Sequence, residues 1–155
     1  MRKRSKYRPK PVLANPLAYV IESITPLAKH DDALVDLKLK NHLAMTVLTR
    51  GEATKQDMDV LIAAVNMTEA MHRLGFGTEY KDIVNTGLAS LYALCNRGAE
   101  SGRFVLRAEE MKALNNVMEL HDAQLEIATV KDIERGIAII ENERRQKKMV
   151  KIKGE

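Results

Sequence analysis

With 155 residues, of which 45% are hydrophobic and only 4% aromatic, the chain is long enough to fold as one domain around its own core. Its single cysteine, Cys95, excludes a disulfide within the chain and a cysteine-based zinc site, and it fits a reducing compartment. The net charge of +4 hides a strong separation. Of the 25 basic residues, 12 lie in residues 1–10 and 144–155, whereas 20 of the 21 acidic residues lie in residues 11–143.

The charge pattern and the prolines divide the chain into three parts. Residues 1–12 are expected to form a basic extended arm, because Pro9 and Pro11 restrict the backbone around them to extended conformations. Residues 13–143 are expected to form a helical domain, and residues 144–155 a basic C-terminal extension.

Neither a secretory signal nor a membrane span is indicated by the sequence. Pro9, Pro11 and Pro16 interrupt the region where a signal peptide has a continuous apolar stretch. The longest apolar run, residues 60–65, is far shorter than the roughly 20 residues that cross a bilayer. We therefore expect a cytoplasmic protein that makes no membrane contact.

Two helices are predicted in the N-terminal third of the chain. The first begins at Asn15, which caps it, and ends before Pro26. The second begins at Asp31 or Asp32, which can cap it, and ends at Gly51, since glycine adopts the left-handed conformation that terminates helices. The apolar residues of this second helix are Leu34, Leu37, Leu43 and Val47.

Two further helices are predicted between residues 54 and 98. Thr54 caps the third helix, with Asp57 as its capping-box partner, and Gly75 ends it. Thr78 is expected to cap the fourth helix, which Gly98 closes. Beyond this glycine the sequence predicts a loop to residue 102 and then an extended link.

The last predicted element is the longest. From about residue 108, the spacing of Leu114, Met118 and Leu125 marks one face of a helix, and the register shifts between Leu125 and Val130. One bent helix and two helices with a break at that point both fit the pattern. The predicted class is all-α: a five- or six-helix bundle with a long C-terminal helix that is either bent or broken, preceded by a basic N-terminal arm.

The late helix carries more apolar residues than one face needs. Val117, Leu120 and Ile127 lie off the main stripe. Surplus apolar surface on a long helix is commonly covered in a homodimer, which we favour. The alternative is a wide stripe that several neighbouring helices bury within one chain.

The sequence contains no convincing catalytic or metal-binding pattern. Glu69 and His72 have the Glu-x-x-His spacing of di-iron helical proteins, but a second such pair is absent, so a solvated glutamate and a boundary histidine explain them better. His121 lies on the late apolar stripe, where we expect a hydrogen-bonded interface histidine, and Cys95 is expected in the core. We therefore predict a protein that is not an enzyme, with no catalytic residue, no metal and no cofactor.

The basic ends are the best candidates for binding a partner. Their cations can meet phosphates or an acidic protein surface, and a tyrosine among them can stack on a base. Solvated tails are the alternative, and cations at a helix end also favour the helix dipole. The candidate binding residues are Arg2, Lys3, Arg4, Lys6, Tyr7, Arg8, Lys10, Arg144, Arg145, Lys147 and Lys148.

Three short segments carry a resemblance to known proteins. Residues 2–12 (RKRSKYRPKPV), 102–106 (GRFVL) and 118–124 (MELHDAQ) resemble segments of small uncharacterised proteins encoded by phages and prophages of proteobacteria. The resemblance implies an accessory protein of a mobile element and carries over no functional residues. Small helical proteins of that origin often bind host machinery, and anti-CRISPR proteins and other anti-defence factors are among them.

Three functions follow from these patterns as hypotheses. The leading one is a non-enzymatic, homodimeric phage-type protein in the host cytoplasm that binds and inhibits or modulates a host nucleoprotein machine. It would use its basic ends, with the acidic body as the alternative contact face. The second is a small DNA- or RNA-binding regulator that uses the same basic ends, and the third is a metal-dependent helical enzyme.

Overall fold

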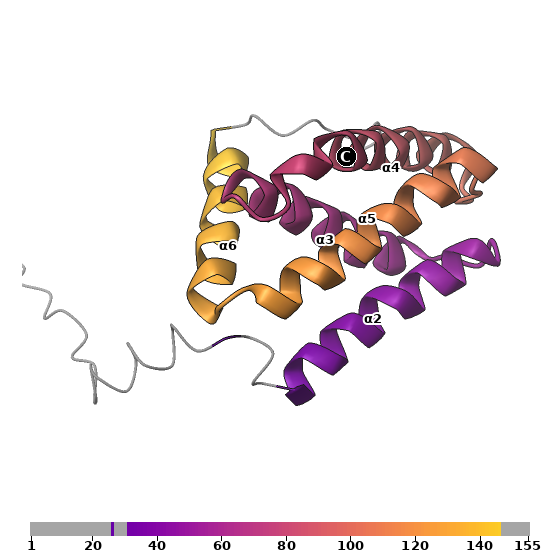
Figure 1. The fold of residues 1–155 in the computed structure, drawn as a ribbon. Helices are drawn as coiled ribbons and strands as arrows, with labels where there is room; N and C mark the ends of the chain where they lie inside the picture. Colours follow the sequence, from indigo (N-terminus) through magenta and orange to yellow (C-terminus); the bar gives the residue numbers. More distant parts are fainter. Residues whose placement is uncertain (1–25, 27–30, 147–155) are drawn as a thin grey trace, which may run out of the picture.

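The computed structural model describes residue 26 and residues 31–146, and its regular elements in these residues are helices (Figure 1). This confirms the all-α class for the described part of the chain. The predicted arm at residues 1–12 and the predicted helix at residues 15–25 lie outside it. The elements are α2 (Asp31–Thr49), α3 (Lys55–Arg73), the short 3-10 helix η2 (Thr78–Tyr80), α4 (Lys81–Ser101), α5 (Ala108–Ile127) and α6 (Val130–Arg145).

Helix α3 is the centre of the arrangement, because it contacts α2, α4, α5 and α6. Helices α2 and α5 lie side by side and antiparallel, with α6 at the far end of α5 (Figure 1). Two polar contacts tie α2 to α5, from Lys38 to Glu126 (2.8 Å) and from His42 to Asp122 (2.6 Å). Among the helices in the described residues, none combines the length and the apolar content needed to cross a membrane.

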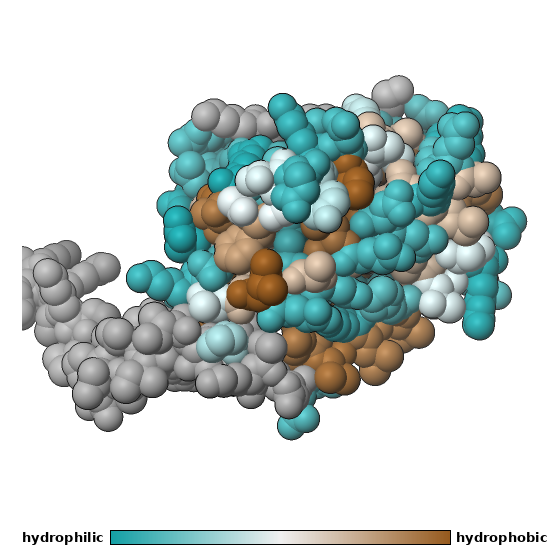
Figure 2. Space-filling view, viewed as in Figure 1, coloured by the Kyte–Doolittle hydropathy of each residue, from teal (hydrophilic) through white to brown (hydrophobic). Residues whose placement is uncertain are grey.

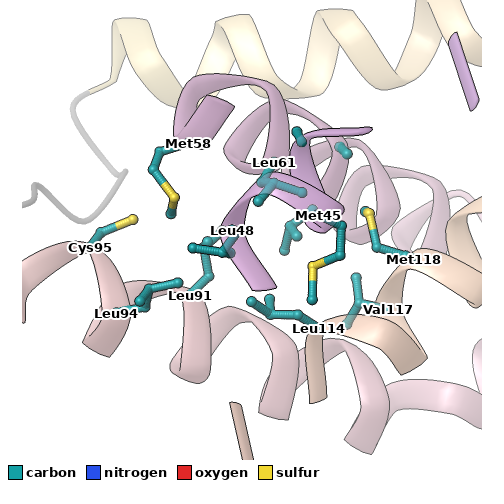
Figure 3. Packing of buried hydrophobic residues seen from close by; sticks show 13 residues of the cluster. Met45, Leu48, Met58, Leu61, Leu91, Leu94, Cys95, Leu114, Val117 and Met118 are labelled. Atoms are coloured by element: carbon teal, nitrogen blue, oxygen red, sulfur yellow. The ribbon is translucent and has the colours of Figure 1, made fainter. Parts of the chain in front are cut away.

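The core lies between α2, α3, α4 and α5 (Figure 3). Burying a leucine, valine or methionine fully contributes about 1.5–3 kcal/mol relative to leaving it exposed. Cys95 is 3% exposed and belongs to this core, as predicted. Core side chains that are at most 2% exposed include Leu48, Met58, Leu61, Leu94, Leu114 and Val117.

Helices α3 and α6 each begin directly after a threonine that caps the helix. Thr54 and Asp57 form the predicted capping box of α3: the Asp57 carboxylate accepts from the Thr54 backbone N–H at 2.7 Å, and the Thr54 hydroxyl oxygen accepts from the Asp57 N–H. A second box joins Thr129 and Asp132 at the start of α6. Ala128, which follows α5, is extended (ψ 151°). The late region is therefore two helices, with the break in the predicted interval.

Both predicted ends of the fourth helix are wrong. Thr78 does not cap it, because this residue lies in η2, which follows the left-handed Gly77 (φ 72°), and α4 begins at Lys81. Gly98 does not close it either: α4 continues to Ser101 and ends at Gly102, whose φ is 75°. Gly98 lies inside the helix, where a Cβ would come within 2.1 Å of the Phe104 ring, so the close packing of Phe104 requires a glycine at this position.

Two of the three apolar residues that favoured a dimer are buried within the chain. Val117 is 0% exposed and packs against α4, where a Cβ on Gly87 would lie 2.0 Å from a Val117 methyl group. Leu120 is 8% exposed and lies beside Gly77. Ile127 is 66% exposed. The wide stripe buried by neighbouring helices is the correct interpretation for Val117 and Leu120.

Candidate functional site

Only two of the predicted binding residues fall in the described part of the chain. Arg144 and Arg145 lie in the last turn of α6, and both are exposed. We call this pair the basic end of α6. The other predicted residues lie outside the described residues, and they are Arg2, Lys3, Arg4, Lys6, Tyr7, Arg8, Lys10, Lys147 and Lys148.

The basic end of α6 is held against α3 by one arginine. Arg73 of α3 donates hydrogen bonds to Glu143, the residue just before Arg144, and to Glu69 at 2.6 Å. The hydrogen bonds to Glu143 and then to Glu69 raise the pKa of Arg73. Near the middle of α6, a Cβ on Gly136 would come within 2.8 Å of the Met67 sulfur, so this glycine allows the two helices to approach closely.

The Glu-x-x-His pair has no further metal-ligating side chains grouped with it among residues 31–146. Glu69 accepts a hydrogen bond from Arg73, and His72 Nε2 lies 3.4 Å from the Thr78 carbonyl oxygen. Within residues 31–146, no group of three or more His, Cys, Asp or Glu side chains is placed to hold a metal ion. The spacing therefore reflects an ion pair on α3 and a boundary histidine.

An ion pair between Arg97 and Glu110 organises the connection from α4 to α5. Arg97 donates two hydrogen bonds to the carboxylate of Glu110, both at 2.5 Å, and a third to the Val105 carbonyl at 3.0 Å. Glu110 also accepts from the Arg107 backbone N–H at the start of α5. The hydrogen bond from Arg97 lowers the pKa of the Glu110 carboxyl group. This contact is structural, because Glu110 is buried and its carboxylate is already bonded.

Three of the buried polar side chains each have one atom without a hydrogen-bond partner among the described residues. His121 is 2% exposed, and burial lowers its pKa to about 4. Its Nδ1, the Asn41 Nδ2 and the Gln124 Oε1 have no hydrogen-bond partner among the described residues. Gln124 Nε2 donates to the carbonyls of Thr68 and Phe76, both at 3.2 Å. We expected a hydrogen-bonded histidine at an interface. For Nδ1 of His121 this expectation is wrong, because the side chain is buried within its own chain and Nδ1 has no hydrogen-bond partner among the described residues.

Helix α2 exposes apolar residues on the side away from the core. Val35, Leu39 and Leu43 are 59%, 64% and 59% exposed, and they follow one another at intervals of four residues. Residues four apart lie on one helical face, so the three form a continuous row, which we call the α2 ridge. Figure 2 shows an apolar area over the part of the surface that α2 occupies in Figure 1.

Sequence reasoning missed the α2 ridge, because it took Leu43 as a typical apolar residue of the second helix. The sequence nevertheless contained a pattern that could have indicated the ridge. Helix α2 has two apolar rows, and only the row that contains Leu34 and Leu48 is buried. A shallow groove borders the ridge at the start of α3. Its lining residues are Lys40, Leu43, Ala44, Gln56, Asp57, Asp59 and Val60.

No protein-family model, no curated protein and no solved structure matches this chain.

Proposed function

We propose that the protein is a non-enzymatic accessory protein of phage type that binds a host nucleoprotein machine and inhibits or modulates it, as anti-CRISPR proteins do. The observation that carries this proposal is the basic end of α6. Arg144 and Arg145 are exposed on a helix that Arg73 ties to α3, and Lys147 and Lys148 follow in the sequence. Such a cluster of cations favours an anionic partner.

The chemistry of the basic end fits either phosphate or carboxylate. The guanidinium group of arginine is planar and donates two parallel hydrogen bonds to either anion. The rest of the domain opposes binding to bare nucleic acid, because residues 11–143 carry 20 acids and 13 basic residues. Like charges repel over distances of about a Debye length, roughly 8 Å in physiological salt. A nucleoprotein whose anionic patch is local suits this charge distribution better than a long duplex.

The proposal is tested by measuring binding to a purified CRISPR effector–guide complex and inhibition of its DNA cleavage. Arg144→Glu combined with Arg145→Glu should weaken both strongly. Lys131→Glu combined with Arg135→Glu makes the same change of charge on the same helix and should leave both nearly unchanged. The idea fails if the full-length protein neither binds nor inhibits such complexes, or if both double variants behave alike.

The alternative is a small DNA- or RNA-binding regulator, favoured by the same exposed arginines. Phosphate contacts release counterions, so affinity would fall steeply with salt, with a slope that reflects the number of contacts. Binding of short duplex and single-stranded DNA across a salt series separates the two functions. Tight, salt-sensitive binding that disappears without residues 1–10 and 144–155 would support the regulator.

The proposed protein acts as a homodimer in the host cytoplasm, without membrane contact. Val117 and Leu120 are already buried in one chain, so an interface must use other apolar surface.

A further inference from the structure

The α2 ridge presents three large apolar side chains to water in a contiguous row. The largest apolar patch of a soluble monomer is typically about 300–600 Å² and is often functional. The opposite face of α2 is already occupied, since it packs against α3 and α5. We propose that a second copy of this chain covers the ridge, in an antiparallel α2–α2 pair. This inference rests on the proposed homodimer and assigns its interface.

The row matches itself when two copies of α2 run antiparallel. A two-fold axis at Leu39 places Leu39 against Leu39 of the partner subunit, and it places Val35 against the partner's Leu43. Each apolar residue of the row then meets another apolar residue. Side chains at intervals of four residues form a ridge of the kind that packs into the groove of a partner helix.

The charges beside the ridge favour the same arrangement. Asp36 and Lys40 lie on one edge of the ridge, and neither forms an ion pair within the described residues. On the other edge, Lys38 and His42 are already bonded to carboxylates of α5. In an antiparallel two-fold pair, equivalent edges meet, so Asp36 approaches the partner's Lys40 and Lys40 approaches the partner's Asp36. A parallel pair would instead bring Lys40 to the edge that carries the partner's Lys38.

The size of the surface indicates a weak dimer. Three side chains that are more than half exposed form an apolar patch on the order of 300 Å². A standard interface buries about 800 Å² on each partner. The ridge and its charged edges offer less than this, which is typical of weak and transient interfaces. The groove between α2 and the start of α3 extends the contact beside Leu43. We therefore expect a dissociation constant on the order of micromolar.

The oligomeric state of the full chain gives the first test. Sedimentation velocity from about 1 to 300 μM should show a monomer–dimer equilibrium. Leu39→Asp places two carboxylates at the two-fold axis and should weaken dimerisation on the order of a hundredfold. Ile137→Asp, at a residue 44% exposed on α6, makes the same kind of change away from the ridge and should leave the equilibrium unchanged. Far-UV circular dichroism confirms that each variant remains helical.

Crosslinking determines the orientation of the two helices. With a short bismaleimide, Leu39→Cys should crosslink to itself, and a mixture of Val35→Cys and Leu43→Cys should give the mixed product in preference to either self-product. The natural Cys95 is buried, so it contributes little background. Asp36→Lys should weaken the dimer, and adding Lys40→Asp should restore it.

Four results would overturn the inference. They are a wild-type protein that is monomeric at every concentration, a dimer that Leu39→Asp leaves intact, and self-products of Val35→Cys that dominate over the mixed product. The fourth is a Leu39→Asp variant that loses thermal stability equally at all protein concentrations, since that result means the chain's own residues cover the ridge. None of these results depends on binding to an effector complex, so the interface and the proposed function can fail separately.

Discussion

Acidification is expected to destabilise the protein through His121. Burial lowers the pKa of this side chain to about 4, whereas the unfolded chain has a histidine near the ordinary value of 6.5. The carboxylate of Asp122 opposes this shift, and His42 and Lys38 reinforce it. The unfolded state therefore binds the proton first, and the stability contributed by neutral His121 is complete above about pH 6.5 and lost as the pH falls towards 4.

The size of the loss follows from the two pKa values. Between pH 7 and pH 5 the free energy of unfolding should fall by about 2 kcal/mol, and by about 3 kcal/mol once the pH is below 4. Urea unfolding followed by circular dichroism measures this change, and pH 5 is the lower limit because carboxylates begin to titrate below it. In His121→Leu the loss should largely disappear, whereas His72→Gln should retain it. An equal loss in wild type and His121→Leu would refute the reasoning.

Three further changes in stability can be measured by the same unfolding assay. Gly87→Ala should lower the free energy of unfolding by about 1–3 kcal/mol, because the new methyl group meets the rigid Val117 side chain. Adding Val117→Ala should recover part of this loss, whereas strictly additive effects of the two substitutions would count against direct contact. Thr129→Ala should cost about 1 kcal/mol by removing the cap of α6, and Thr129→Ser should not. Glu110→Gln should cost about 1–3 kcal/mol because it leaves the Arg97 charge without its carboxylate partner, and a cost near zero would mean that solvent replaces it.

Local signals predicted the helices well where the decisive contacts are local. Thr54 and Asp57 cap α3 through atoms three residues apart, and Gly51 ends α2 with a left-handed φ of 73°. The failures lie where a distant residue decides. Gly98 resembles a helix end in the sequence, but it is a glycine inside α4 because the Phe104 ring occupies the space that any side chain would need.

The surfaces were harder to predict than the helices for a related reason. Periodicity shows that Val117 and Leu43 are apolar residues of helices, but it does not show what faces them. Val117 faces Gly87 of α4 and is buried, whereas Leu43 faces away from the core and is 59% exposed. The exposure of Arg144 and Arg145, the two proposed binding residues in the described part of the chain, could be predicted from charge alone, because exposed cations need no particular packing.

The proposed interface and the proposed function make a joint prediction. A dimer carries two basic ends of α6, so a partner with two anionic patches would be bound bivalently, and its second contact would form at a high effective concentration. Leu39→Asp should then lower the apparent affinity for such a partner by tenfold or more at nanomolar protein, although Arg144 and Arg145 are unchanged. Ile137→Asp should bind as wild type does. If Leu39→Asp binds as tightly as wild type while it is monomeric, each basic end acts alone and bivalence has no part in recognition.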